Sequence, residues 1–348
     1  MKYISSFALI VLLLVSLEGC KKENDNPISP TPTQQNPTSV ETYRFDSTIP
    51  WEQTKDGAGV NITALSVVLD ASGNSHILAG SWTGVFNSTD NGTSWRVSTV
   101  GLGDTAISCF AIKGTTVYVG TDSKGVFKST DYGITWISSN NGIATTNISD
   151  LMITKEGNLF AATNGNGIFV SLNSGSSWSP VDSGLTSQNV YTLVCNTDGN
   201  GTTNIFAGTW GSGVFRSNNN GSNWTPVNNG LASLTVDALG MSDDGTSSLF
   251  AGTYSCIFRS TNNGSNWVAL NNGLSNKTIC SIVAADTSIF VATAGGGVYL
   301  STNKGINWTT INFGMPTDYV FCFAINKNVS GGHTLFAGTG NGIWRHPI

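Results

Sequence analysis

The sequence of 348 residues is poor in charge, and in positive charge most of all. Charged residues make up 11% of it, against about 25% in an ordinary soluble domain. Lys and Arg number 16 against 21 Asp and Glu, which gives a net charge of −5. A nucleic-acid-binding protein needs a basic stripe. The composition therefore argues against a nucleic-acid partner.

Histidine is also scarce, with three residues that are scattered along the chain. We expect His76 and His333 to lie in surface loops at equivalent turns. No Cys–His spacing is typical of a zinc site, and the Asp-Gly turns lack the further acidic ligands of a calcium site. The sequence therefore predicts no metal and no cofactor.

Long hydrophobic runs are lacking except for Phe7–Leu17, an 11-residue run preceded by Lys2. This run is too short to span a bilayer core of about 30 Å, and it predicts a signal peptide over residues 1–19. The run ends in Leu17-Glu18-Gly19-Cys20, which resembles the bacterial lipobox. The resemblance implies cleavage before Cys20 and lipidation of that cysteine. The alternative is an ordinary secretory signal with an incidental cysteine.

Residues 20–43 are polar and contain four of the nine prolines, which predicts a disordered tether. The lack of Asp directly after Cys20 resembles the sorting rule for outer-membrane lipoproteins of Gram-negative bacteria. We therefore expect a cell-envelope lipoprotein that meets the membrane only through its lipid. Periplasmic and surface orientations remain alternatives.

Glycine (41 residues) and tryptophan (10 residues) are abundant, and they recur in a repeat. Six segments fit Ser-x-(Asp/Asn)-x-Gly-x-x-Trp, with successive Trp spacings of 41, 42, 46, 43 and 41 residues. These segments resemble the Asp box, or BNR repeat, of sialidase-type β-propellers. A period of about 43 residues with four short strands is typical of one propeller blade.

The repeat predicts an all-β, single seven-bladed propeller over residues 44–348. The last segment stops where its own motif should begin, and Trp51 with Asp46 resembles a degenerate motif. We therefore expect residues 44–56 to supply the outermost strand of the last blade and close the ring. An open six-bladed ring is the alternative.

The motif residues are expected to be structural, because four of the six motifs carry Asn where a catalytic or metal-binding carboxylate could not be exchanged easily. Ser and Asp or Asn can bond the backbone of a tight turn, and Gly permits positive φ. The predicted structural positions are Asp90, Trp95, Asp131, Trp136, Asn173, Trp178, Asn219, Trp224, Asn262, Trp267, Asn303 and Trp308.

Enzymes that carry such repeats need residues that this chain supplies poorly. Sialidases use an arginine cluster and a Tyr–Glu pair, and this chain has five arginines and five glutamates. The xyloglucan-cleaving glycosidases use two aspartates, for which Asp150 and Asp237 could face the central channel. Inversion would require two carboxyl groups about 6.5–9.5 Å apart. The resembling enzymes pair two propellers around a cleft, whereas one is predicted here.

Five cysteines remain besides Cys20. Four of them fall in or at the end of predicted inner strands, where small buried side chains are expected. Cys280 and Cys322 lie on adjacent blades and are the candidate disulfide pair.

The less repetitive loop positions are the better binding candidates, because they share the propeller face opposite the motifs. Exposed aromatic side chains beside amides and carboxylates suit stacking on a sugar or docking of a protein. The candidate ligand-binding residues are Trp82, Asp104, Asp122, Trp210, Tyr254, Lys277, Asp318 and Tyr319.

The look-alikes by repeat style are the photosystem II assembly factors and the sortilin-like receptors, which bind proteins or peptides. The favoured hypothesis is thus a monomeric, non-catalytic envelope propeller that binds a protein or a glycan. One alternative is a glycoside hydrolase acting on a polysaccharide. Another is a structural envelope protein without a discrete site, in which Trp82 and Trp210 would be buried.

Overall fold

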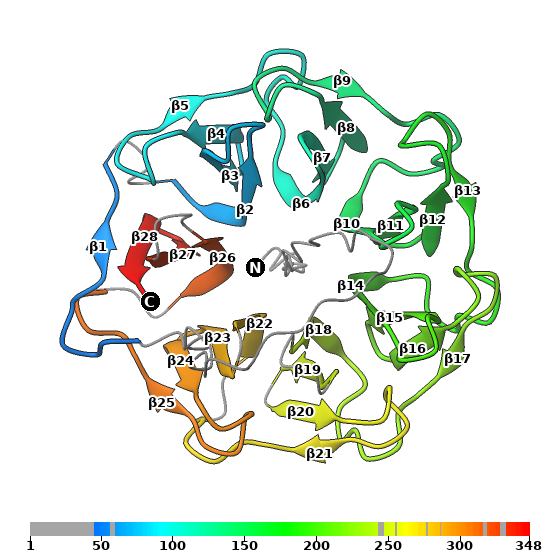
Figure 1. Cartoon of the computed structure of the whole chain (residues 1–348). Coiled ribbons are helices and arrows are strands. Elements are labelled where there is room, and N and C mark those ends of the chain that lie inside the picture. The colour runs from blue at the N-terminus through cyan, green and yellow to red at the C-terminus, as the bar shows by residue number, and fades with distance from the viewer. Residues whose placement is uncertain are drawn as a thin grey trace, which may run out of the picture.

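The computed structural model describes residues 45–55, 60–242, 247–254, 256–275, 278–285, 287–315, 319–327 and 332–348. These residues form 28 strands, and no helix occurs among them. The strands make seven four-stranded antiparallel sheets that are arranged in a ring (Figure 1). The protein is therefore a seven-bladed β-propeller, as the repeat predicts. The predicted signal peptide, Cys20 and tether lie outside the described residues.

Each blade runs from the axis of the ring to its rim in four strands. The innermost strands are β2 (Ile62–Leu69), β6 (Ile107–Lys113), β10 (Ile148–Ile153), β14 (Val190–Thr197), β18 (Val236–Met241), β22 (Thr278–Ala285) and β26 (Val320–Lys327). The second strands are β3 (Ser75–Ser81), β7 (Thr116–Thr121), β11 (Leu159–Thr163), β15 (Thr203–Thr209), β19 (Leu249–Thr253), β23 (Ser288–Ala294) and β27 (His333–Thr339).

The third and outermost strands complete the blades. The third strands are β4 (Gly84–Ser88), β8 (Val126–Ser129), β12 (Ile168–Ser171), β16 (Gly213–Ser217), β20 (Ile257–Ser260), β24 (Gly297–Ser301) and β28 (Gly342–Pro347). The outermost strands are β5 (Arg96–Val97), β9 (Ile137–Ser138), β13 (Ser179–Pro180), β17 (Thr225–Pro226), β21 (Val268–Ala269), β25 (Thr309–Thr310) and β1 (Glu52–Gln53).

The second strands read as continuous apolar runs because a neighbouring blade covers each of their faces. In β19 all five residues of the run Leu-Phe-Ala-Gly-Thr are buried. The glycine of this run lies where adjacent blades approach most closely. A Cβ atom at Gly120 would lie 2.7 Å from Cγ2 of Ile148 in the next blade, and one at Gly338 would lie 2.7 Å from Cγ2 of Ile62. A side chain there would push the blades apart.

The hydrophobic core is divided into seven clusters, and each cluster lies between two adjacent blades. Every cluster contains one buried tryptophan from the repeated motif or its degenerate copy. The seven are Trp51, Trp95, Trp136, Trp178, Trp224, Trp267 and Trp308. The repeated Trp therefore packs each blade against the preceding one.

The ring closes where β1 joins the last blade. Glu52 pairs with Arg345 and Gln53 with Trp344 in antiparallel register, and the blue strand β1 lies beside the red strand β28 in Figure 1. Trp51 repeats the contacts of the motif tryptophans, because its Nε1 donates to the carbonyl of Ile311 (2.6 Å) and its backbone N–H to Phe313 (2.8 Å). The predicted closure by residues 44–56 is thus confirmed.

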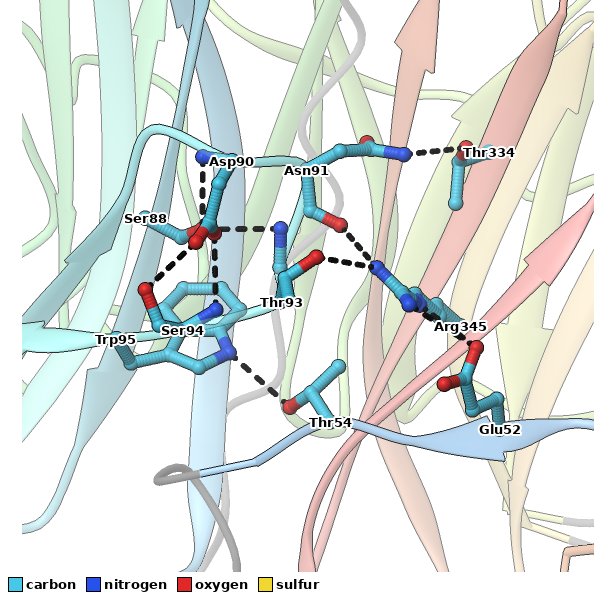
Figure 2. A network of polar contacts seen from close by, with 11 residues as sticks. Glu52, Thr54, Ser88, Asp90, Asn91, Thr93, Ser94, Trp95, Thr334 and Arg345 are labelled. Atoms are coloured by element: carbon cyan, nitrogen blue, oxygen red, sulfur yellow. Dashed lines mark hydrogen bonds and ion pairs between the residues drawn. The ribbon is translucent and has the colours of Figure 1, made fainter.

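Polar contacts join the closing strand to the first blade (Figure 2). Trp95 Nε1 donates to Thr54 Oγ1 (3.0 Å). Arg345 makes an ion pair with Glu52 (3.0 Å) and donates to the carbonyl of Asn91 (2.7 Å). The same strand position in other blades also donates to the next motif, as Lys128 does to the Ser174 carbonyl (3.3 Å). The recurrent basic residue therefore connects neighbouring blades at Lys128, Arg259 and Arg345, whereas Arg216 donates to Asn204 in its own blade (2.6 Å).

Two expectations about single residues are wrong. His76 and His333 lie in strands β3 and β27 and are partly buried. Their partner strands continue far enough to pair with them, at Val68 and Lys327, and the His76 ring stacks on Tyr132 with 4.8 Å between centroids.

The candidate disulfide does not form either, since all five described cysteines are free. The thiols of Cys280 and Cys322 lie near backbone carbonyls instead, those of Thr278 (3.7 Å) and Ile62 (3.8 Å). Burial raises the pKa of the Cys280 thiol to about 12 and that of Cys322 still further. Both thiols are therefore neutral near pH 7.

Candidate functional site

The strand order places two sets of loops on one face of the ring, which we call the loop face. The loops between second and third strands lie there, together with the segments that lead into each inner strand. Bridges between blades show this, because Asn164 pairs with Asn189 and Ala294 pairs with Tyr319. The motif turns lie at the other end of the strands. The loop face therefore gathers the binding candidates as expected.

Four large aromatic side chains are exposed on the loop face. Trp82 and Trp210 are each 51% exposed, Tyr254 is 73% exposed and Tyr319 is 56% exposed. They come from blades 1, 4, 5 and 7, so they are spread along the ring from blade 4 round to blade 1 and are missing from blades 2 and 3. We call these four residues the aromatic arc. Exposed aromatic rings of this size carry most of the binding energy in many interfaces.

The backbone of the aromatic arc is fixed by hydrogen bonds. The Trp210 N–H donates to the Asn189 carbonyl (3.1 Å), and Ser187 Oγ donates to the Trp210 carbonyl (3.1 Å). The Trp210 ring also lies 5.9 Å from the buried ring of Tyr191, tilted by 51°. Thr278 Oγ1 donates to the Tyr254 carbonyl from the next blade (3.2 Å). The rings are therefore presented by ordered loops, which limits the entropy lost on binding.

The remaining part of the loop face, at blades 2 and 3 and the segment leading into blade 4, is polar. Asp104, Asp122, Asn164 and Gln188 are exposed there, and Asn147 is partly buried. The predicted binding residues thus fall into two groups, the aromatic arc and this polar sector. Lys277 and Asp318 lie outside the described residues.

A feature that the sequence did not reveal is a bulge in every inner strand at the loop-face end. Each register shift leaves one extra residue close to the axis, and we call these seven residues the axial bulge ring. They are Thr63, Ser108, Ser149, Tyr191, Asp237, Cys280 and Phe321. Bulges bend a strand and re-aim side chains, often beside functional sites.

Hydroxyl groups in the axial bulge ring connect adjacent blades. Thr63 Oγ1 donates to the Ile107 carbonyl (2.6 Å), and Ser149 Oγ donates to the Val190 carbonyl. Both acceptors belong to the first residue of the next inner strand. The side chain at this position therefore points toward a carbonyl oxygen of the neighbouring blade. A carboxylate cannot donate a hydrogen bond to that oxygen.

Asp237 is that carboxylate. It is partly buried, and no described residue donates a hydrogen bond to its side chain or forms an ion pair with it. Loss of hydration raises its pKa to about 6. Asp237 is therefore a carboxyl group that has lost water without gaining a partner among the described residues.

Asp150 directly follows the bulge residue Ser149 in β10 of blade 3, and it is fully buried. Its Oδ1 accepts from the Leu151 N–H (2.7 Å), and its Oδ2 accepts from the Leu193 N–H of the next blade (2.7 Å). Burial raises its pKa well above the usual range in spite of these bonds. An acid–base pair needs two carboxyls whose pKa values move apart, whereas those of Asp150 and Asp237 both rise.

The repeated motif forms a closed hydrogen-bonded turn. Ser260 Oγ donates to Asn262 Oδ1 (2.9 Å) and accepts from the Gly264 N–H (2.9 Å), and Asn262 Oδ1 accepts from Asn266 (2.9 Å). Asp90 makes the same set of bonds in the first blade. Partial burial alone would raise the pKa of Asp90, but hydrogen bonds from Ser94 and Ser88 lower it to about 2.

Other kinds of site were sought in the described part of the chain. No three His, Cys, Asp or Glu side chains gather there in a way that could hold a metal ion. None of the described segments forms a helix that is long and apolar enough to cross a membrane.

Comparisons with known proteins identify the fold. No protein-family model and no curated protein sequence matches the chain. Among solved structures, the extracellular domain of BT4673 from B. thetaiotaomicron is similar, with a TM-score of 0.68 and 18% identity. That match covers 85% of this chain and 40% of BT4673. The chain thus spans less than half the length of that protein.

Two further similar structures have different roles. The GH74 xyloglucanase from Xanthomonas campestris has a TM-score of 0.66 and 15% identity, over 85% of this chain and 53% of the enzyme. YCF48 bound to D1 peptide has a TM-score of 0.65 and 17% identity, over 86% of this chain and 97% of YCF48. At such identities the likeness establishes the seven-bladed propeller fold, and function must be argued from the site.

Proposed function

We propose that the protein is a non-catalytic binding propeller, which holds a protein or glycan ligand against the aromatic arc on its loop face. The observation that carries this proposal is the exposure of Trp82, Trp210, Tyr254 and Tyr319, between 51% and 73%, on the same face of the ring. Exposed apolar groups gathered on a monomer mark interaction sites. Burial of Trp82 and Trp210 would have favoured a purely structural role, and both side chains are exposed.

The repeated motifs are the scaffold of this site in our proposal. Their serine, Asp or Asn and tryptophan side chains bond their own turn or the preceding blade. Asn replaces Asp in four motifs without loss of the bond from the residue four positions later. The motifs thus hold the blades in place, and the loop face is left to vary with the ligand.

We place the protein in the bacterial cell envelope, as a monomer held at the outer membrane by a lipid on Cys20. The apolar run at residues 7–17 and the Leu-Glu-Gly-Cys sequence support this location. The extracellular location printed for the similar BT4673 domain is compatible with it. Whether the propeller faces the periplasm or the cell surface depends on its ligand.

The test is a glycan-array and hydrolysis screen with the soluble fragment of residues 44–348, together with a pull-down from envelope extracts. A Trp82→Ala/Trp210→Ala double variant is compared with Leu172→Ala, which removes a side chain that is 72% exposed but lies in a motif turn away from the loop face. We expect binding without turnover, reduced at least about tenfold by the double variant and unchanged by Leu172→Ala. Turnover of a polysaccharide would instead establish a glycosidase. Binding unaffected by the double variant would place the site elsewhere.

A further inference from the structure

The charge of the loop face bears on which ligand it accepts. Besides Asp237, exposed carboxylates occur at Asp104 and Asp122. Lys124 lies in the same loop as Asp122, but its ammonium group is directed at the Leu102 carbonyl (3.3 Å). The whole chain carries a net charge of −5. An approaching cation is therefore attracted to this face, whereas a polyanion is repelled.

Asp237 is the carboxylate of this face with the strongest need of a partner. It stands in the axial bulge ring, where Thr63 and Ser149 satisfy a neighbouring carbonyl by donating a hydrogen bond. A carboxylate cannot donate such a bond, and no described residue donates one to it. A partly buried charge without a partner costs free energy, which a donor or cation from outside can offset.

Aromatic side chains flank this position along the ring. Tyr191 occupies the axial bulge ring of the preceding blade and contacts Trp210. Tyr254 follows the second strand of the blade that holds Asp237, and it is 73% exposed. Because Tyr191 is only 3% exposed, the rings open to a ligand are those of Trp210 and Tyr254, and together with the carboxylate they offer an ion pair and cation–π contacts. A lysine or arginine side chain combines an apolar stem and a cationic head that match these two kinds of group.

We propose that the axial end of blade 5 is a subsite for one basic side chain of a protein partner, with Asp237 as its counter-ion and the aromatic arc as the surface for the flanking residues. This proposal rests on the proposed binding function and names the ligand of the same face. A neutral glycan could stack on the rings, but it would leave the charge of Asp237 without compensation.

The test begins with the selection of random short peptides, displayed on phage, against the immobilised 44–348 fragment. We expect the selected peptides to be enriched in Arg or Lys next to aromatic or aliphatic residues. A parallel selection against the Asp237→Asn variant should lose the basic residue and retain the apolar ones. Failure to enrich a basic residue with the unaltered protein would overturn the proposal.

The selected peptide is then measured by fluorescence anisotropy in two forms, with arginine and with the neutral isostere citrulline. We expect Asp237→Asn and the citrulline exchange each to weaken binding about tenfold. Because each change removes one partner of the same pair, the two together should weaken it little more than either alone. Asp198→Asn is the matched control, because it removes one charge from the turn between β14 and β15, at the end of the strands away from the loop face, and it should leave the affinity within about twofold.

The two proposals fail in distinguishable ways. If Trp82→Ala/Trp210→Ala abolishes peptide binding while Asp237→Asn leaves it unchanged, the aromatic arc binds and the basic subsite is wrong. If only glycans bind, the binding function again stands without the basic subsite. If neither variant affects any ligand, both proposals are wrong.

Discussion

At the residue scale, the repeated motif shows that one position can change its chemistry without changing its geometry. Asp90 and Asn262 each accept a hydrogen bond from the N–H four residues later, at 2.9 Å in both cases. The residue that follows has a positive φ of 55° at Asn91 and 54° at Asn263. The backbone bond of the turn uses one side-chain oxygen, which Asn supplies as well as Asp, and the second group adapts, since Asp90 Oδ2 accepts from the Ser94 hydroxyl whereas the Asn173 NH₂ donates to that of Ser177. The motif therefore requires an acceptor and not a charge.

Asp237 is expected to destabilise the free protein near neutral pH. Its pKa in the folded state is about 6, above the ordinary 3.8, so the folded state binds more protons than the unfolded state between these values. Stability then falls as the pH rises through this window. The neighbouring thiol of Cys280 on β22 has a pKa of about 12 and stays neutral there. We predict that Asp237→Asn stabilises the fold by about 1–2 kcal/mol near pH 7.

This prediction is checked by thermal unfolding of both proteins near pH 7 and near pH 4. The variant should melt a few degrees higher near pH 7, and the difference should shrink near pH 4, where the unaltered carboxyl is protonated in the folded state. A difference of the same size at both pH values would show that Asp237 acts through packing and not through its charge. Retention of a destabilising carboxylate is the usual mark of a functional group.

At the element scale, the sequence predicts the four strands of each blade, but it does not predict the bulge at the loop-face end of each inner strand. The motif fixes the hairpin between third and fourth strands, because serine, glycine and tryptophan each have a required position in it. The bulges have no such signature. Thr63, Tyr191 and Asp237 share a backbone geometry and no chemistry. The bulges arise where the seven inner strands converge on one axis. The sequence pattern of a single blade gives no sign of that convergence.

The binding candidates, too, were predictable from the sequence only in part. Position after a second strand was enough to find Trp82, Trp210 and Tyr254, because the repeat aligns the loops. The pairing of Trp210 with Tyr191, and the lack of a partner for Asp237 in the described part of the chain, depend on how strands distant in sequence come together. The sequence therefore indicated the face, and the structure added the axial bulge ring.

Asp150 connects two elements, β10 and β14. Each of its oxygens accepts one backbone N–H, from Leu151 and from Leu193. Asparagine has one oxygen and would turn its NH₂ group toward the other donor. We predict that Asp150→Asn lowers the free energy of unfolding by about 1–3 kcal/mol, the cost of a buried unsatisfied group.

Asp198 provides the matched control in the same pair of blades. Its single Oδ1 accepts from both Asn200 and Thr202 (3.0 and 2.9 Å), so asparagine can replace it. Denaturant unfolding should show a large loss for Asp150→Asn and almost none for Asp198→Asn. Equal effects would mean that the second oxygen of Asp150 contributes nothing to the join between blades 3 and 4.

At the scale of the whole molecule, the ring is held by seven similar interfaces, one of which depends on an outermost strand, β1, that is distant in sequence from the rest of its blade. The interface of the last blade contains Trp51, which is 3% exposed, and Met315, Ile311 and Trp344 around it. The ion pair of Arg345 with Glu52 lies beside it, but the Glu52 side chain is 66% exposed. Apolar burial and not charge therefore stabilises the closure.

We predict that Trp51→Ala lowers the free energy of unfolding by about 3–5 kcal/mol, as for other buried tryptophans, and that Glu52→Gln lowers it by less than about 1 kcal/mol. Because β1 has no covalent neighbour in its own blade, loss of Trp51 should also raise amide hydrogen exchange in β28 before it does so in the opposite blade, β14–β17. Trp267→Ala, at the equivalent position within the ring, is the control for a general loss of packing. If both variants raised exchange evenly around the ring, the propeller would unfold as one unit. The closure of the ring by β1 would then be no weaker than the other six interfaces between blades.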